Sequence, residues 1–260
     1  MGFPVIAIVA IVDVAIQWFF FVISAILKTE KFFDLVGGFS FITCISISFF
    51  MNDQYDHVLS IVQYVCICVW AARLGLFLMY RIWKDGRDRR FDDIKVNPIK
   101  LFITWNGQAV WVFLTLFPTL FLFEWAKLDG KDPYIGQFVG WAIWLLGFLC
   151  EVVADQQKLI FKGKPENKGK FINCGLWSIS RHPNYLGEIT LWWGLYISAV
   201  TVFSEWWWIL VAAVGPIWVT FLLGFFSLRM LEKSSDERYG ENEGYQEYKS
   251  KTKILIPFII

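Results

Sequence analysis

The sequence has little of what metal centres, nucleic-acid-binding proteins and soluble dinucleotide-binding domains need. Only 2 of its 260 residues are histidines, and its 5 cysteines lack metal-like spacing and fall mostly in apolar runs. We therefore predict buried thiols, with no metal centre and no disulfide framework. The net charge of +1 gives no overall attraction to nucleic acid, and we expect no such partner. Neither a Gly-x-Gly-x-x-Gly segment nor a P-loop occurs, so any dinucleotide needs a non-Rossmann site.

Hydrophobic residues are abundant instead, at 57% of the chain, with 19% aromatic. These values are typical of a multi-pass membrane protein. The first apolar run has no basic flank before it and is too long for a signal peptide, so we interpret it as a retained span. A span needs about 20 mainly apolar residues. We predict an all-α polytopic membrane protein with about seven transmembrane helices, at residues 4–27, 32–51, 58–80, 101–123, 135–154, 185–203 and 206–228.

The charged residues separate onto two sides of these seven spans. One side holds residues 28–31, 81–100, 155–184 and the C-terminal tail, with nearly all lysines and arginines. The cations of the other side are Lys127 and Lys131. The positive-inside rule then places the basic loops and the C-terminus on the cytosolic or matrix side. We expect an integral protein of the endoplasmic reticulum, the mitochondrial inner membrane or, in a prokaryote, the bacterial inner membrane.

The C-terminal tail and the tryptophans fit the same arrangement. Residues 232–260 are polar at first and end in an apolar run from Ile254, which predicts an amphipathic segment that returns to the bilayer. Trp125, Trp177 and Trp206–Trp208 fall near predicted interfaces, as an aromatic belt requires. No repeat or second soluble domain is visible, so we predict a single integral-membrane domain over the whole chain.

The segment before the sixth span carries the densest group of polar residues. Asn184 and Glu188 are four residues apart and share a helix face, and Pro183 suits a first helical turn. Arg181 and His182 would precede this helix, where free backbone N–H groups favour an anion. A carboxylate inside a span suggests a functional site. The alternative is an interfacial anchor that binds lipid phosphate.

A second polar group lies at the end of the fifth span. Glu151, Asp155 and Lys158 are spaced i, i+4, i+7 and line one helical face. Two carboxylates so close suit a cation or a hydroxyl-bearing ligand. The alternative is an internally satisfied ion network at a helix end.

A third group is the basic loop after the third span, which includes Arg81 and Arg87. Arginine binds phosphate bidentately, so this surface suits a nucleotide. The alternative is that the basic loop only sets the orientation of the protein in the membrane and binds anionic lipid. The cations expected to join the loop are Lys162, Lys164, Lys168, Lys170, Arg181 and Arg229.

Isolated polar residues also occur inside predicted spans. Arg73 in the third span needs a partner at membrane depth. Gln17 and Gln108 also lie inside spans, where single polar residues often only form hydrogen bonds between helices. Asp13 and Asp34 are expected near a bilayer edge or at a helix contact.

Together these motifs resemble the steroid 5-alpha-reductase superfamily, in its branch of short members, from about Trp70 to the C-terminus. The similar segments are Arg73-Leu74-Gly75 with Arg81 and Gly86–Phe91, Glu151 with Asp155-Gln156-Gln157-Lys158, Gly175-Leu176-Trp177 with Arg181–Glu188, and Tyr245–Tyr248 with Ile256-Pro257-Phe258. The resemblance implies a seven-helix fold that binds NADPH from the cytosolic side and takes an apolar substrate laterally. It divides the domain into substrate-side helices with the first basic loop, residues 1–100, and a nucleotide-binding core with the tail, residues 101–260.

The resemblance also implies roles for individual residues. The matched nucleotide-site positions are Glu151, Asp155, Asn184, Glu188 and Arg229, to which we add Lys158, Arg181, His182, Tyr248 and Arg87. The steroid enzymes carry a substrate-polarising Glu and Tyr on earlier helices, which this sequence does not clearly match. Glu188, Tyr185 and Arg73 are the candidate catalytic residues for reducing an activated C=C bond in a steroid, enone or polyprenoid-like lipid.

Two alternatives remain open. Isoprenylcysteine carboxyl methyltransferases, which use S-adenosylmethionine, share an Arg-His-Pro-x-Tyr-x-Gly segment, and Arg229, Glu232 and Tyr248 fit their C-terminal pattern. The other alternative is a reductase-like accessory subunit of a larger membrane complex, without turnover. The expected partners are a hydrophobic small molecule, membrane lipids and, in this last case, neighbouring membrane-protein subunits.

Overall fold

The computed structural model describes residues 4–86, 88, 91–126, 128 and 134–255. Within these ranges the regular structure is helical, apart from an isolated parallel bridge between Ser180 and Lys253. The chain divides into two compact units. Unit 1 takes in residues 1–134 and 199–215, and unit 2 takes in residues 135–198 and 216–260. The prediction of an all-α polytopic membrane protein is confirmed.

Six helices in the described ranges are long and apolar enough to cross a membrane. They are α1 (Val5–Leu27), α2 (Phe33–Met51), α3 (Val58–Asp85), α4 (Pro98–Trp125), α5 (Ile135–Gly163) and a long helical segment, Trp206–Tyr239. The remaining predicted span, 185–203, corresponds to α6 (Pro183–Val200), an 18-residue helix that is not among the six. Asn184 and Glu188 occupy its first two turns, which leaves a short apolar part. The prediction of seven spans is therefore confirmed for six.

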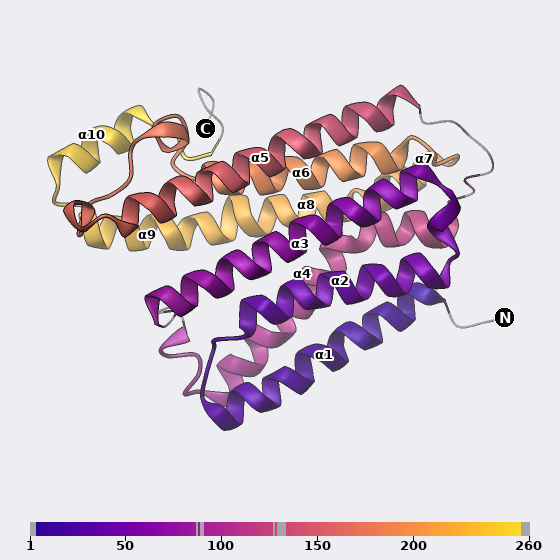
Figure 1. Ribbon diagram of the computed structural model, residues 1–260, viewed down its shortest axis with the longest axis horizontal. Helices are drawn as coiled ribbons and strands as arrows, with labels where there is room; N and C mark the ends of the chain where they lie inside the picture. The colour runs from indigo at the N-terminus through magenta and orange to yellow at the C-terminus, as the bar shows by residue number, and fades with distance from the viewer. Residues whose placement is uncertain (1–3, 87, 89–90, 127, 129–133, 256–260) are drawn as a thin grey trace. The chain divides into compact units, whose positions relative to one another are not determined.

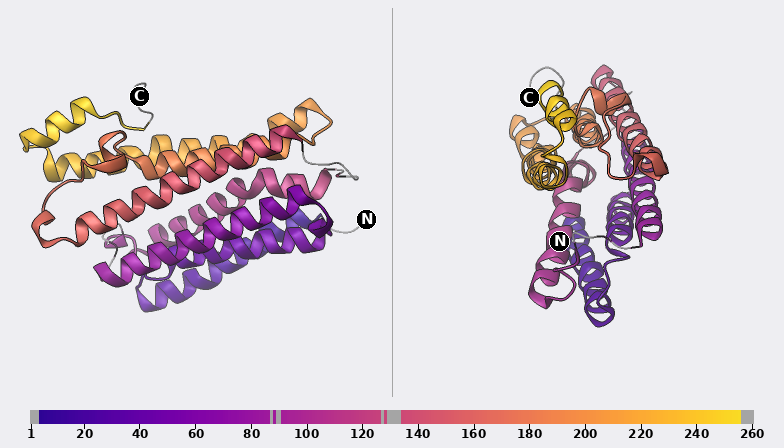
Figure 2. Two further views of the ribbon diagram at one scale, coloured as in Figure 1. Left: turned by 45° about the horizontal axis from the view of Figure 1, so that its top comes forward. Right: turned by 90° about the vertical axis from the view of Figure 1, so that its left-hand side faces the viewer.

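Unit 1 is built from α1, α2, α3 and α4, which run side by side (Figures 1 and 2). Its core is largely aromatic. Phe41, Trp70 and Trp105 are at most 1% exposed, and Phe41 packs edge-on against Trp70 with ring centroids 5.0 Å apart. Ile11 and Phe19 on α1 are about 60% exposed. Large apolar side chains on the outside of a packed helical unit are what contact with lipid tails requires.

Unit 2 contains α5, α6 and the C-terminal part of the helix Trp206–Tyr239 (Figure 1). This helix comprises α7 (Trp206–Ala212), α8 (Val214–Phe221), a π-helical segment, η5 (Leu222–Ser227), and α9 (Leu228–Tyr239). The helix is interrupted at Ala213 near Pro216, which has no backbone N–H to donate to the preceding turn. Trp193 of α6 donates a hydrogen bond to Thr220 of α8 at 3.0 Å. This bond ties α6 to the long helix.

Candidate functional site

Helices α5 and α6 are antiparallel and approach so closely that backbone meets backbone. A Cβ added at Gly147 would lie 2.6 Å from a backbone nitrogen of α6, and one added at Gly187 would lie 2.6 Å from the nitrogen of Glu151. Gly140 and Gly194 repeat this contact seven residues away on each helix. Small residues allow this approach in membrane helix pairs, and here only glycine fits. The contact holds the acidic end of α5 against the polar start of α6.

This approach brings together two groups of predicted site residues. The Asn184 Nδ2 donates to Asp155 Oδ1 at 3.2 Å. Glu151, Asp155 and Glu188 are 2%, 7% and 7% exposed, so three carboxyl groups are buried within unit 2. The side-chain oxygen of Asn184, Oδ1, is buried and accepts no hydrogen bond from the described residues. A buried acceptor without a donor is costly, and a bound ligand with a polar hydrogen would satisfy it.

Arg181 and His182 both meet Glu232 of α9. Arg181 NH1 lies 2.6 Å from Glu232 Oε2, and His182 Nε2 lies 2.7 Å from Oε1. The Arg181 contact is an ion pair without hydrogen-bond alignment, and Arg181 Nε is buried with no acceptor among the described residues. Burial lowers the pKa of His182, although its hydrogen bond to Glu232 opposes the shift. The imidazole is therefore neutral at pH 7, and Arg181 carries the positive charge.

A buried tryptophan holds the loop between α5 and α6 in place. The Trp177 indole N–H donates to the Ala154 carbonyl at 3.0 Å, and the Lys158 ammonium lies 4.4 Å from the ring centroid. The Tyr248 hydroxyl donates to the Trp177 carbonyl at 2.5 Å, and burial raises the pKa of Tyr248, which keeps the donor protonated. Trp177 is 3% exposed, so its prediction as a belt residue is wrong. Packing against α5 places the ring in the core.

The C-terminal tail is fastened to the same loop. The Arg181 backbone N–H donates to the Lys253 carbonyl at 2.9 Å, and Ser180 Oγ donates to the Leu255 carbonyl at 2.8 Å. Between α9 and α10 (Glu243–Lys251), Lys249 pairs with Asp236 at 2.6 Å. The tail as described therefore binds the loop before α6. The apolar end predicted to return to the bilayer lies largely outside the described residues.

Most other predicted site residues also belong to unit 2. Arg229 places its guanidinium 3.7 Å from the ring centroid of Phe225, and the rings of Tyr185 and His182 are 6.0 Å apart. The predicted cofactor residues found in unit 2 are Glu151, Asp155, Lys158, Arg181, His182, Asn184, Glu188, Arg229 and Tyr248. Arg87 lies outside the described residues.

Arg73 belongs to unit 1. It is half-buried on α3, with its guanidinium 5.1 Å from the ring centroid of Phe77. Arg73 and the Phe77 ring that it packs against both lie in unit 1. A catalytic role for Arg73 stays a prediction.

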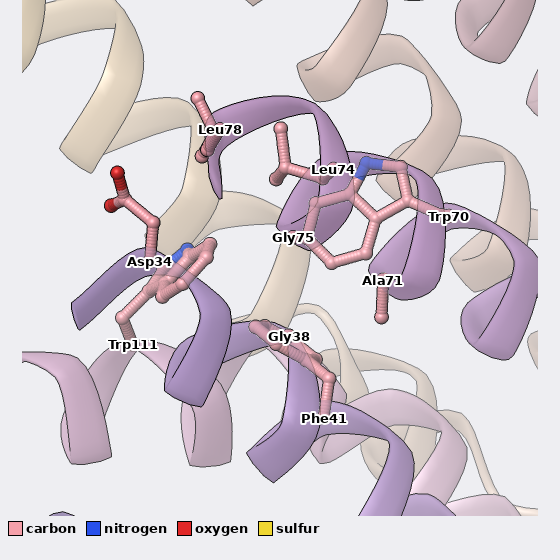
Figure 3. A pocket seen from close by; sticks show the side chains of 9 residues that line it. All are labelled: Asp34, Gly38, Phe41, Trp70, Ala71, Leu74, Gly75, Leu78 and Trp111. Carbon is pink, nitrogen blue, oxygen red and sulfur yellow. The ribbon is translucent and has the colours of Figure 1, made fainter. Parts of the chain in front are cut away.

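Unit 1 contains a small pocket of about 20 Å³ between α2, α3 and α4 (Figure 3). The labelled side chains show Asp34 on one side and Leu74, Leu78 and Trp70 of α3 on the other. The pocket is mostly apolar. Its volume is far below the roughly 300–1,000 Å³ of typical ligand sites, so in this conformation it has room for about one water molecule.

Sequence reasoning missed two features of the site. Glu232 fitted only the methyltransferase alternative, yet it joins Arg181 to His182. The glycine contact was not predicted, although the spacing of seven between Gly140 and Gly147, repeated in α6, was visible in the sequence. No periodic signal could have indicated Glu232, because it lies 50 residues from His182.

These features define a polytopic helical membrane protein with a buried polar site at one end of a close helix pair. The chain belongs to the family "Protein of unknown function (DUF1295)", which matches residues 20–252. The resemblance inferred from the motifs is confirmed as a distant one. No solved structure matches the chain.

Three curated proteins illustrate this similarity. The 3-oxo-5-alpha-steroid 4-dehydrogenase 1 of Rattus norvegicus is 24% identical over 160 residues, which cover 62% of this chain and 53% of that protein. An uncharacterized protein of Schizosaccharomyces pombe is 28% identical over 210 residues, covering 69% and 58%. The probable O-methyltransferase ustE of Ustilaginoidea virens is 39% identical over 61 residues, covering 24% and 20%. The matches span less than two thirds of the length of each relative.

Proposed function

We propose that this protein is a membrane-embedded oxidoreductase that uses NADPH to reduce an activated C=C bond in a hydrophobic substrate. The observation that carries the proposal is the close contact of α5 with α6, which holds Asp155 against Asn184. Two polar atoms in this region, Asn184 Oδ1 and Arg181 Nε, have no hydrogen-bond partner among the described residues. The similarity to the rat steroid dehydrogenase supports the reaction class.

The residues present suit the chemical groups of a dinucleotide. Arg181, although paired with Glu232, has an Nε–H without an acceptor among the described residues that suits phosphate, and the buried carboxyl groups of α5 and α6 suit ribose hydroxyls. Bound NADPH would supply the hydride, which adds to the carbon beta to a carbonyl, while a proton adds at the neighbouring carbon. The chain's own tasks are to hold the reactants in a dry site, to polarise the carbonyl and to deliver the proton. Glu188 and Tyr185 are the candidates for the last two tasks.

The substrate class follows from the surroundings. A hydrophobic enone or steroid-like lipid would dissolve in the bilayer and reach the protein laterally.

Calorimetry and thermal shift with the purified full chain in detergent test the cofactor. NADPH should bind and raise the melting temperature, because a ligand of the folded state stabilises it by mass action. Glu188→Gln and Asn184→Ala should weaken binding at least tenfold. Glu247→Gln is the matched control, because Glu247 is exposed and pairs only with Lys251 on its own helix among the contacts described. Equal affinity in all variants would contradict the site.

S-adenosylmethionine is the second candidate ligand, and one observation favours it. The 61-residue match to the probable O-methyltransferase has the highest identity of the three similarities, at 39%. Binding of S-adenosylmethionine without NADPH would assign the protein to the methyltransferases. Binding of neither would contradict both proposals and favour a non-catalytic subunit of a membrane complex.

A further inference from the structure

Helix α1 buries its polar residues and exposes its apolar ones. Its buried residues are Val9, Asp13, Gln17 and Ser24, of which three are polar. Ile26, by contrast, is 74% exposed. The helix therefore turns a polar stripe towards the interior of unit 1. Sequence analysis placed Asp13 at a bilayer edge or a helix contact, and the structure shows the contact.

In the described part of the chain, α1 and the two helices packed against it carry no lysine or arginine outside their terminal turns. Asp13 is the only charged residue of the 23-residue helix α1, lies well inside it, and is 1% exposed. The helices packed against α1 are α2 and α4. Their charged residues, Asp34, Lys100 and Glu124, lie in the first or last turns, and their other titratable side chain is the buried thiol of Cys44. An ionised carboxylate in this position would be desolvated without an opposite charge.

The hydrogen bonds around Asp13 leave acceptors without a donor. Gln17 Nε2 donates to Asp13 Oδ1 at 3.3 Å and to Ser40 Oγ at 2.9 Å, which uses both amide hydrogens. Gln17 and Ser40 are 0% exposed. Asp13 Oδ2 and Gln17 Oε1 are buried, and neither receives a hydrogen bond from any residue that the structure describes. Two buried acceptors without a donor are a site for a proton.

We propose that Asp13, Gln17 and Ser40 form an intramembrane proton-binding site in which Asp13 is held as the neutral carboxylic acid. The site takes one proton from solvent and converts the carboxylate to a carboxyl group whose O–H is a hydrogen-bond donor. This removes the buried charge and supplies the missing hydrogen. The site is separate from the polar residues of unit 2, and the proposal does not depend on the proposed reductase activity.

Infrared spectroscopy of the full chain in lipid nanodiscs tests the proposal. With 13C-labelled aspartate, the wild-type protein at pH 7 should show the C=O stretching band of a protonated aspartic acid, shifted in D2O. The band should be lost in Asp13→Asn and kept in Asp56→Asn, the same change at an exposed carboxyl group. Absence of the band from the wild-type spectrum would overturn the proposal, and this result does not require any variant to fold.

A stability measurement distinguishes a proton bound at Asp13 from a metal cation bound there. If Asp13 is protonated, Asp13→Asn replaces one neutral side chain by another of the same shape, and its melting temperature should equal or exceed that of the wild type. The wild-type melting temperature should be the same in sodium chloride and in choline chloride. A lower melting temperature for Asp13→Asn, together with stabilisation by sodium, would show a bound cation at an ionised Asp13 and would contradict the proposal.

Discussion

The charge of the buried side chains in unit 2 depends on residue type together with burial. His182 and Arg181 are neighbours in sequence and both contact Glu232, but only Arg181 keeps its charge at neutral pH. The reason is desolvation, which lowers the pKa of the 5% exposed imidazole. A neutral His182 accepts or donates one hydrogen bond at each ring nitrogen, so it orients Glu232 without neutralising it.

The depressed pKa of His182 predicts a pH-dependent stability. In the unfolded chain the imidazole returns to its usual value of 6.5, so between the two pKa values the unfolded state binds more protons. The free energy of unfolding should therefore fall as the pH drops below about 6.5. Denaturant unfolding from pH 8 to pH 5 would measure this slope. His182→Gln should have a smaller slope, and an identical slope would contradict the assignment.

Tyr248 illustrates a residue whose predicted role and observed contact differ. Sequence analysis assigned it to the cofactor, whereas its hydroxyl donates to the Trp177 carbonyl. Tyr248→Phe should lower the free energy of unfolding by about 1 kcal/mol, the usual net worth of a hydrogen bond. Tyr239→Phe is the control, since its hydroxyl makes an exposed 3.3 Å contact with the Lys170 carbonyl. A Tyr248→Phe variant with unchanged stability and lost NADPH binding would favour the cofactor role.

The α5–α6 contact decides the geometry of the site at the scale of elements. Its glycines bring the two backbones together, and polar residues one to two turns beyond them come into hydrogen-bond range. A side chain in this contact would push the helices apart and separate Asn184 from Asp155.

Gly147→Ala tests this contact. The new Cβ would meet backbone atoms at 2.6 and 2.7 Å, so we expect a loss of about 1–3 kcal/mol of stability, as for other overpacked sites. NADPH binding should weaken in parallel. Gly107→Ala in α4 is the matched control, because its Cβ would meet nothing within 4 Å. The control should gain about 0.5–1 kcal/mol, since alanine is the better helix former. Equal effects of the two substitutions would contradict the close contact.

The start of α1 is stabilised by a side chain from another helix. The backbone N–H groups of Val5 and Ile6 each donate to the Glu124 carboxylate at 3.1 Å. A carboxylate at a helix N-terminus satisfies free donors and interacts favourably with the helix dipole.

Glu124→Ala should therefore lower the free energy of unfolding by about 0.5–2 kcal/mol, the cost of losing a helix cap. Glu205→Ala is the control, because Glu205 precedes α7 and makes no side-chain cap hydrogen bond. Thermal unfolding of both variants in detergent would measure the difference. A loss that is no larger for Glu124→Ala than for the control would show that the cap contributes nothing.

At the scale of the whole molecule, most lysines and arginines lie in every second loop between the helices and in the C-terminal tail. Several helices also extend beyond their apolar runs on the basic side: α3 ends at Asp85, α5 at Gly163 and α9 at Tyr239. In each case the last turns continue the helix with polar residues past the point where the apolar run ends.

This topology predicts the labelling of cysteines in sealed, oriented vesicles. Cys174 is exposed and lies in the basic loop between α5 and α6, whereas Cys44 and Cys66 are buried. A membrane-impermeant maleimide should react with Cys174 from the cytosolic or matrix side only. An Asp56→Cys substitution in a Cys174→Ser background should react from the opposite side. Labelling of both positions from one side would contradict the alternation.

The sequence by itself determined where most of the membrane helices lie along the chain. A crossing of the bilayer needs about 20 mainly apolar residues. The first residues of α1, α2 and α3 could therefore be predicted to within one position. The candidate site residues on α5 and before α6 were also identifiable, because charge at membrane depth is costly enough to stand out.

Only the tertiary structure decided which of these groups meet. The pairing of Glu232 with Arg181, and of Gln17 with Ser40, depends on how helices far apart in the chain pack. Hydrophobic periodicity shows which face of a helix is apolar but does not name its neighbour. In α1 the periodicity indicates the wrong face as buried. Its apolar residues face outward, and its polar residues face the interior of unit 1. The close contact at the glycines and the burial of Asp13 both depend on how side chains of different helices fit together in three dimensions.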